Sequence, residues 1–303
     1  MSAIPSYGFN TFMNVAYEPK PKSAKAAILG CPFDYGVHQT RIGARLGPSA
    51  IREMSALLRA NEPETNVDVV ECLGLVDCGD AAVTPSQVRE SFEAIERAMN
   101  PILEAGAVPV TMGGDGMVSL PQMRAYAKHH GTFAVIHIDA HTDAYPMQGF
   151  NPATTFIRAA GEGLIDTEVS FHIGMRGPTV VPGVYDTGEE LGFTLVTMKG
   201  LRAKGVAAVA EEVKAKIGER PCYLCWDMDF FDPSVAPGVC TPEWGGATTR
   251  EGFELLDALE GFNWIGFDCN TVSPPHDPTG ATAHLAAVVM LKFLTKLALA
   301  ARS

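Results

Sequence analysis

Short apolar runs alternate along the chain with longer segments of helical period. Eight of these runs are predicted to be strands, and they cover residues 26–29, 69–76, 108–112, 133–139, 169–173, 194–196, 222–228 and 264–269. Nearly continuous apolar strands separated by amphipathic helices are typical of a parallel sheet that is covered on both faces. The pattern therefore predicts an α/β fold.

The segments between the strands have the apolar spacing of amphipathic helices. They cover residues 86–106, 119–131, 204–218 and 249–261, and a closing helix is expected over 282–301. Each lies where a right-handed crossover between parallel strands requires one. No repeat, low-complexity linker or long charge run divides the chain. We predict a single domain over residues 1–303, with an N-terminal extension over residues 1–25.

Two acidic clusters occur where predicted strands end. Asp139 ends one strand and is followed by His141 and Asp143, while Asp227 and Asp229 lie at the end of another. The carboxyl ends of parallel strands face the ligand crevice of an open α/β sheet, so we expect these side chains to converge. Carboxylates and imidazoles suit Mn²⁺, Zn²⁺, Ni²⁺ or Fe²⁺, and two such ions can share a hydroxide nucleophile for hydrolysis.

Composition and charge exclude several classes of partner. The chain of 303 residues is 47% hydrophobic, which is enough to bury a large core. Its net charge of −12 and pI near 5.1, without a Lys or Arg cluster, argue against nucleic acid and anionic membranes as partners. We find no apolar run near the ~20 residues of a membrane span and no signal peptide, so we expect a cytoplasmic protein.

The cysteines do not predict a disulfide framework. Seven are scattered over the chain, which is an odd number. Cys222 and Cys225 have the spacing of a metal or redox pair. They lie in a predicted strand, however, where residues three apart point to opposite faces. We expect buried thiols there, in a reducing compartment.

Five segments resemble the signature blocks of the arginase/agmatinase ureohydrolases, in that family's order, between about residues 26 and 290. They are GCPFDYGVHQTRIGARLGPSAIREMS, MGGDGMVSLP, IHIDAHTDAY, CWDMDFFDPSVAPGVCTPEWGG and FDCNTVSPPHDPTGATAHLAA. The resemblance implies a three-layer α/β/α domain with a central eight-stranded, mostly parallel sheet, assembled as trimers or hexamers. It also implies hydrolysis of a guanidinium group, with release of urea, at a pair of Mn²⁺ or Ni²⁺ ions.

The resemblance also assigns the metal ligands. Asp139 and Asp227 match the carboxylates that bridge both ions. His141 and Asp229 match ligands of one ion, and Asp143 matches a ligand of the other. Five of the family's six ligands are therefore expected in this chain.

Three positions depart from the family pattern. Gly116 stands where the sixth metal ligand, a histidine, is expected, and Pro152 stands where active members carry a loop histidine for proton transfer. Thr271 occupies the place of the glutamate that binds the substrate guanidinium, and a hydroxyl cannot form that charge-assisted, bidentate contact. We expect partial metal occupancy or none in this chain, and little turnover by the chain alone.

Three functions fit this pattern. The first is a degenerate subunit that supports an active paralogous chain, as in two-gene guanidine or biguanide hydrolases such as metformin hydrolase. The second is an amidinohydrolase that is active alone, in which His276 or Glu243 replaces a lost group. The third is a non-enzymatic module that binds metal or a guanidine, because a fold does not fix a function.

Several other residues allow two interpretations. His137 is in phase with Asp139 and could point toward the site, but a histidine on a buried strand is more often a core residue. Asp115 could support a metal site or cap the helix that follows it. Arg41, Arg45 and Arg52 could bind an anion, although positioning a loop and forming subunit contacts is the expected role.

Overall fold

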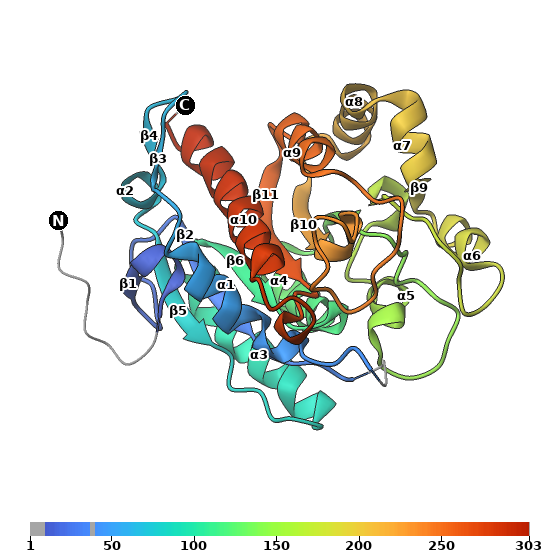
Figure 1. Ribbon diagram of the computed structural model, residues 1–303, viewed down its shortest axis with the longest axis horizontal. Helices are drawn as coiled ribbons and strands as arrows, with labels where there is room; N and C mark the ends of the chain where they lie inside the picture. The colour runs from blue at the N-terminus through green and yellow to red at the C-terminus, as the bar shows by residue number, and fades with distance from the viewer. Residues whose placement is uncertain (1–9, 37–39, 303) are drawn as a thin grey trace.

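A nine-stranded parallel sheet forms the centre of the molecule (Figure 1). The computed structural model describes residues 10–36 and 40–302. In spatial order the strands are β1 (Ala16–Tyr17), β5 (Val76–Asp80), β2 (Ala26–Cys31), β6 (Val108–Gly113), β11 (Asn263–Asn270), β10 (Pro221–Asp227), β7 (Ala134–Ile138), β8 (Phe171–Ile173) and β9 (Thr194–Val196). A separate antiparallel pair is formed by β3 (Asn61–Glu62) and β4 (Val67–Asp68).

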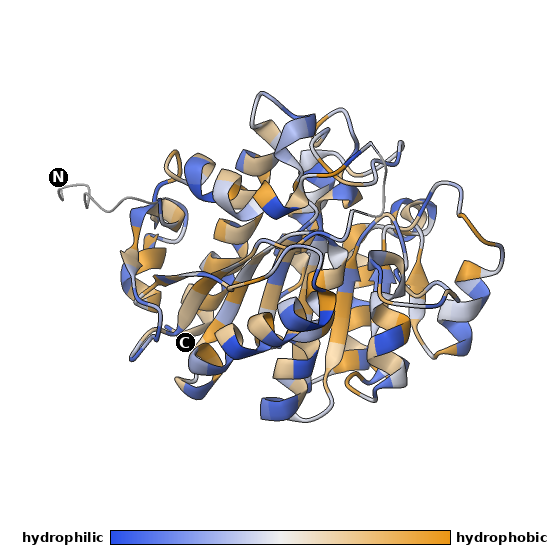
Figure 2. Cartoon of the chain, turned by 90° about the horizontal axis from the view of Figure 1, so that it is seen from below, coloured by the Kyte–Doolittle hydropathy of each residue, from blue (hydrophilic) through white to orange (hydrophobic). Residues whose placement is uncertain are grey.

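Helices cover both faces of this sheet. One apolar core lies beneath α1 (Gly47–Ser55), α2 (Val69–Leu73), α7 (Met198–Lys204), α8 (Val206–Ile217), α9 (Thr249–Ala258) and α10 (Ala281–Ala300). The other lies beneath α3 (Val88–Glu104), α4 (Ser119–His130) and α5 (Thr155–Gly161), and α6 (Val184–Glu190) packs near β9. Apolar residues gather on the strands and polar ones on the outer helix faces (Figure 2). The predicted three-layer α/β/α fold is confirmed.

Successive side chains of β10 point to opposite faces of the sheet, and so into different apolar cores. Cys222 belongs to one core and Cys225 to the other, and both are free thiols. The prediction that these two cysteines point to opposite faces of the sheet is therefore confirmed.

Two parts of the predicted sheet differ in the structure. Residues 69–76 were predicted as a strand, but Val69–Leu73 forms α2 because Asp68 caps its first turn and Gly74 ends it at φ 55°. The strand begins only at Val76. In addition, Ala16–Tyr17 pairs with β5 and gives the sheet a ninth strand. Residues 1–9 of the expected N-terminal extension lie outside the described part.

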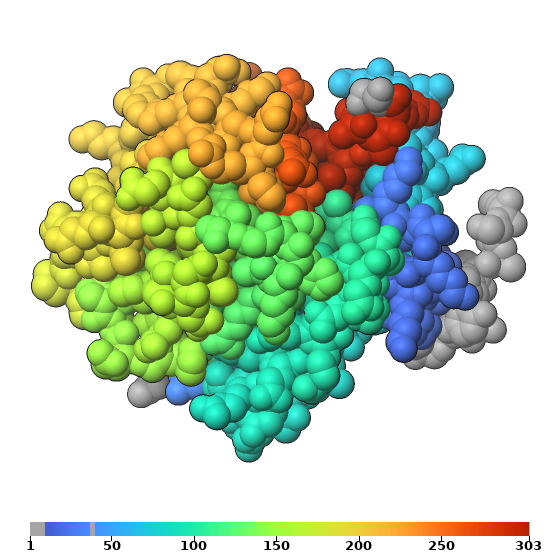
Figure 3. All heavy atoms as spheres, turned by 180° about the vertical axis from the view of Figure 1, so that it is seen from behind, coloured from blue at the N-terminus to red at the C-terminus, as the bar shows by residue number. Residues whose placement is uncertain are grey.

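Among the described residues, α10 is long and apolar enough to cross a membrane by length and composition alone. The expectation from the sequence that no apolar run is near the length of a membrane span is therefore wrong for this helix. Ten of its residues are buried, and it packs on α1, α2, α9 and β11. Its C-terminal end lies beside the β3–β4 segment (Figure 3), where Arg302 reaches the Asn66 carbonyl. We assign α10 as a core helix.

A buried ion pair ties α1 to the edge of the sheet. Arg52 is 6% exposed, and its Nε and Nη2 atoms donate to the two oxygens of Asp77 at 2.8 and 2.9 Å. Asp77 also accepts from the Phe12 amide at 2.8 Å. Asp80 accepts from Nη1 at 2.6 Å. Arg52 therefore ties α1 to β5, and its guanidinium is occupied by carboxylates of the chain itself.

Replacing Asp77 tests this tie. Asp77→Ala leaves the Arg52 guanidinium buried without its main partner, which should lower the free energy of unfolding by about 3–5 kcal/mol. Urea unfolding followed by circular dichroism measures the loss. The exposed pair Arg250–Glu254 on α9 supplies the control, since Glu254→Gln should barely move the midpoint. Equal effects of the two variants would contradict the role of Asp77.

Candidate metal centre

The candidate residues lie at the carboxyl ends of four adjacent strands, along one edge of the sheet. β6, β11, β10 and β7 are consecutive neighbours. Gly116 lies in the short 3₁₀ helix that follows β6, and Thr271 follows β11 directly. Asp227 ends β10 and Asp139 follows β7. Because the strands are parallel, all of these residues meet at the same edge.

A cavity of about 730 Å³ opens at this edge. Gly116, His141, Pro152 and Thr271 lie on its wall. Six carboxylates also line it: Asp34, Asp115, Asp143, Asp227, Asp229 and Glu243. Of the two candidate substitutes for a lost catalytic group, Glu243 lines the cavity and His276 does not.

The first group with metal-ligand spacing consists of Asp139, His141 and Asp229. Their candidate ligand atoms all lie within 4.8 Å of one another. His141 Nδ1 is 3.1 Å from Asp139 Oδ1 and 3.2 Å from Asp229 Oδ2. Asp139 Oδ1 also accepts from the His141 amide at 2.6 Å, which holds the carboxylate toward the imidazole.

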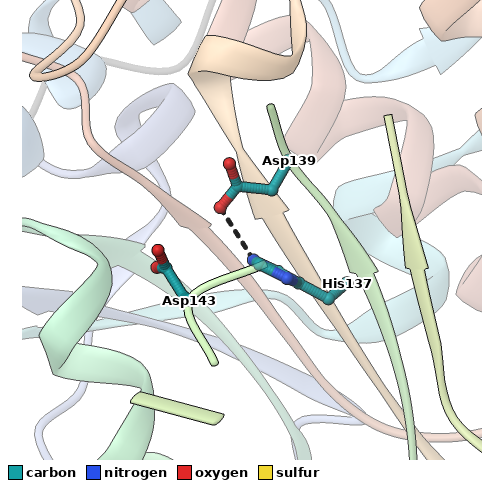
Figure 4. A group of neighbouring side chains, drawn as sticks. All are labelled: His137, Asp139 and Asp143. Atoms are coloured by element: carbon teal, nitrogen blue, oxygen red, sulfur yellow. Dashed lines mark ion pairs between the residues drawn. The ribbon is translucent and has the colours of Figure 1, made fainter. Parts of the chain in front are cut away.

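The second group consists of His137, Asp139 and Asp143, whose ligand atoms again lie within 4.8 Å (Figure 4). His137 Nε2 is 2.8 Å from Asp139 Oδ2. Asp139 thus belongs to both groups, with one oxygen facing His141 and the other facing His137. Two neighbouring sites that share one carboxylate have the layout of a binuclear centre.

Asp227, the other predicted bridging ligand, lies outside both groups. Its Oδ1 atom accepts from the Asp229 amide at 2.7 Å and from the hydroxyl of Thr271. Of the five predicted ligands, the structure therefore brings Asp139, His141, Asp143 and Asp229 to ligand spacing. It places Asp227 beside them on the cavity wall.

Two of the departures from the family pattern are neighbours. A Cβ atom added to Gly116 would lie 2.9 Å from Asp143 Oδ2 and 3.8 Å from Pro152 Cβ. A side chain at position 116 would thus point directly at Asp143, where the family's sixth ligand is expected. Asp143 is 8% exposed, and its carboxylate accepts no hydrogen bond among the described residues.

Thr271, where the resemblance leads us to expect a glutamate, contacts the protein itself. Its φ of 66° is unusual for a β-branched residue and indicates local strain. The backbone is held there by the Thr271 amide, which donates to the Gly114 carbonyl at 2.7 Å. The hydroxyl donates a hydrogen bond to Asp227, and it carries no negative charge that could bind a guanidinium.

Burial and mutual repulsion shape the charges of the cluster. Burial and the charge of Asp139 raise the pKa of Asp143 well above its ordinary value and that of Asp229 to about 6. Burial, Asp229 and Asp139 raise the pKa of Asp227 as well. Burial lowers the pKa of His141, but the neighbouring carboxylates outweigh it and raise the pKa. This surplus of buried acceptors, with two imidazoles, fits a divalent cation.

Burial also raises the pKa of Asp139, but His137 and His141 outweigh this effect and lower it below its ordinary value. Asp139 therefore remains ionised and available to both groups. Behind it, burial and His137 lower the pKa of His172.

The remaining candidates have structural contacts. Asp115 caps the turn at Gly116 through the Met117 amide at 3.1 Å and also accepts from the Tyr35 amide at 2.7 Å. Arg41 donates to the Val239 carbonyl, and Arg45 donates from Nε to Asp34 at 2.7 Å. These arginines position loops at the cavity wall.

The sequence alone does not assign His137 to the site. Its phase with Asp139 is a signal for the site, whereas its place on a buried strand favours a core role. The structure shows it 1% exposed and directed at Asp139, so it is both buried and part of the site.

Comparison with known proteins places this geometry in context. The family model described as "Arginase family" matches residues 24–295. The agmatinase of Enterobacter sp. is 37% identical, over 92% of this chain and 89% of that protein. The guanidinobutyrase of Pseudomonas aeruginosa is 35% identical, over 96% and 92%. The solved proclavaminate amidino hydrolase of Streptomyces clavuligerus superposes with a TM-score of 0.91 at 32% identity, covering 96% of this chain and 98% of that one.

The stability of the metal-free protein should fall as the pH rises. Asp229 and Asp115 have pKa values of about 6 and about 7, above the ordinary 3.8, so the folded protein binds more protons than the unfolded chain in between. The raised pKa of His141 acts in the same direction. Urea midpoints in a chelator should therefore decrease between about pH 5 and about pH 7.

Excess Mn²⁺ should reverse this decrease, because a cation compensates the carboxylates that lose their protons. Asp229→Asn removes one of the titrating groups and should flatten the pH dependence of the metal-free protein. A midpoint that rises over the same interval in the chelator would contradict the assignment.

Proposed function

Because the chain belongs to the arginase family, we propose that it is a supporting subunit with little activity of its own. Its partner is an intact paralogous chain in a mixed trimer or hexamer. The assembly hydrolyses a substituted guanidine or biguanide. One observation carries this proposal: the Thr271 hydroxyl donates a hydrogen bond to Asp227, and the residue has no carboxylate that could bind a guanidinium.

Two losses on the cavity wall support the impairment. At position 271 the chain has no carboxylate to bind a guanidinium, and losing such a buried charged contact costs about 2–5 kcal/mol. At position 152 a proline replaces the expected proton-transfer histidine, and a missing acid or base costs about 10²- to 10⁴-fold in rate. Both losses concern the substrate and its protons, and neither requires an empty metal site.

The cation-binding residues fit retention of metal. His141, Asp139 and Asp229 would hold a divalent cation, Mn²⁺ or Ni²⁺, and a second cation would lie toward Asp143. When bound, such cations lower the pKa of a water molecule and polarise the substrate. Asp227, oriented by Thr271, would face the same cavity.

A second candidate is an amidinohydrolase that is active alone. The observation that favours it is the pair of ligand groups that share Asp139, since this is the layout that binuclear hydrolysis needs. Relatives named agmatinase, guanidinobutyrase and guanidinopropionase span nearly the whole chain. On this alternative Glu243 is the carboxylate on the cavity wall that would bind the substrate cation.

Turnover by the purified chain separates the two. With excess Mn²⁺ or Ni²⁺ and a panel of agmatine, guanidinobutyrate and dimethylbiguanide, we expect no urea or amine release above the metal-only control. Mixing with an intact paralogue encoded in the same genome should give turnover and co-elution in gel filtration. Turnover by the chain alone would overturn the proposal and establish the second candidate.

Restoring the lost groups should restore activity. Pro152→His and Thr271→Glu together supply a proton-transfer group and a guanidinium anchor. We expect guanidine hydrolysis by the isolated chain to rise by about tenfold or more. The same background with Thr271→Val, which removes the hydroxyl without adding charge, is the matched control. Equal rates for the two double variants would show that position 271 does not bind the substrate.

A further inference from the structure

His137 lies near the carboxyl end of β7, just before the candidate metal ligands Asp139 and His141. It is the fourth residue of β7, two residues before Asp139, so both side chains project from the same face. The side chain is 1% exposed. Its Nε2 atom is directed at Asp139 Oδ2, at 2.8 Å, and Asp143 faces the same point from the following loop (Figure 4).

Asp143 is the aspartate of this cluster that has no hydrogen-bond donor within the described part of the chain, although it is only 8% exposed. A buried carboxylate without donors is costly unless it is protonated or faces a cation. Gly116, the residue opposite it, has no side chain to offer.

We propose that His137 Nε2 replaces the absent imidazole of position 116 as the nitrogen ligand of a divalent cation held with Asp139 and Asp143. His172 fixes the tautomer that this role needs. The proposal concerns cation binding, and it holds whether or not the isolated chain turns over substrate.

His172 supports the ring of His137 from behind. The two Nδ1 atoms are 2.8 Å apart, so one ring donates and the other accepts. If His137 donates from Nδ1, its Nε2 atom keeps a free lone pair that faces Asp139 and Asp143. Metal-bound histidines are commonly oriented in this way by a partner on the second ring nitrogen.

Two aromatic rings hold His172 in place, since its ring centroid lies 5.1 Å from that of Phe156 and 4.2 Å from that of Phe193. Within the described part of the chain, its buried Nε2 atom has no hydrogen-bond partner. This aromatic packing leaves His137 as the only described hydrogen-bond partner of the His172 ring.

The same distances allow a competing arrangement. If His172 donates to His137, then His137 Nε2 carries the proton and donates to Asp139. His137 would then orient a ligand without being one. The two arrangements differ in whether a nitrogen lone pair is needed, and a glutamine distinguishes them. Its amide donates from a comparable position but offers no nitrogen lone pair.

His137→Gln tests the proposal by metal content. We expect the wild-type chain, saturated with Mn²⁺ and desalted, to hold two ions per chain and to show the exchange-coupled Mn²⁺ EPR spectrum of a pair. The variant should hold one ion and lose the coupling. His129→Gln, an exposed position on α4, is the control and should match the wild type. Because the amide oxygen of glutamine can itself bind Mn²⁺, His137→Phe, which offers no ligand atom, is measured beside it and should also lose one ion. Two coupled ions in His137→Phe, or fewer than two in the wild type, would overturn the proposal.

His172→Phe gives a second test that stands even if His137→Gln does not fold. Phenylalanine fits the aromatic surroundings but cannot hydrogen-bond to His137 Nδ1. Titration calorimetry with Mn²⁺ should show about 10- to 100-fold weaker binding of one ion and unchanged binding of the other. Two unchanged affinities would overturn the role of His172. Because no substrate is used, either result is independent of the turnover test of the proposed function.

Discussion

The central constraint on this protein is the burial of four aspartates at one edge of a parallel sheet. Asp139, Asp143, Asp227 and Asp229 are all less than a tenth exposed and lie close enough to repel one another. The topology fixes their position, because each lies at or just after the carboxyl end of β7 or β10, in the middle of the sheet. Without positive charge, several of them must bind protons when the protein folds.

The aspartates differ in how their charge is compensated. Asp227 accepts from a backbone amide and from Thr271, and Asp229 accepts from the Ala140 amide at 3.1 Å. Asp139 lies between two imidazoles. Asp143 has no such donors in the described structure, so it gains the most from a cation. On the proposed assignment, His137 completes the coordination beside Asp143, so the site tolerates glycine at position 116.

The sequence predicted most of the fold because its signals were local and repeated. Apolar runs located the central strands, and strand ends located Asp139 and Asp227. The prediction was wrong at Val69–Leu73, where a cap at Asp68 and a left-handed Gly74 outweigh an apolar run that would also suit a strand. The pairing of Ala16–Tyr17 with β5 could not be predicted either, since two residues carry no periodic signal.

The site was less predictable because its contacts join segments that are distant in the chain. The phase of His137 with Asp139 could be seen, but not the distance of Asp143 or the support of His172, which comes from β8. The sequence shows a threonine at position 271, where the resemblance leads us to expect a glutamate. That the threonine hydroxyl orients Asp227 follows from a left-handed backbone at a residue type that rarely adopts one.

Under the proposed function, the cation and the guanidinium are held by groups on different strands of the sheet. The candidate cation-binding groups lie on β7, on β10 and on the loops that directly follow them, whereas the guanidinium anchor is expected after β11. A threonine at position 271 therefore supplies no anchor, while its hydroxyl still holds Asp227 in place. Buried carboxylates with raised pKa values destabilise a metal-free fold at neutral pH, so a chain that binds no cation would be more stable without them. Their presence is consistent with a subunit that still binds metal after losing the means to hold its substrate.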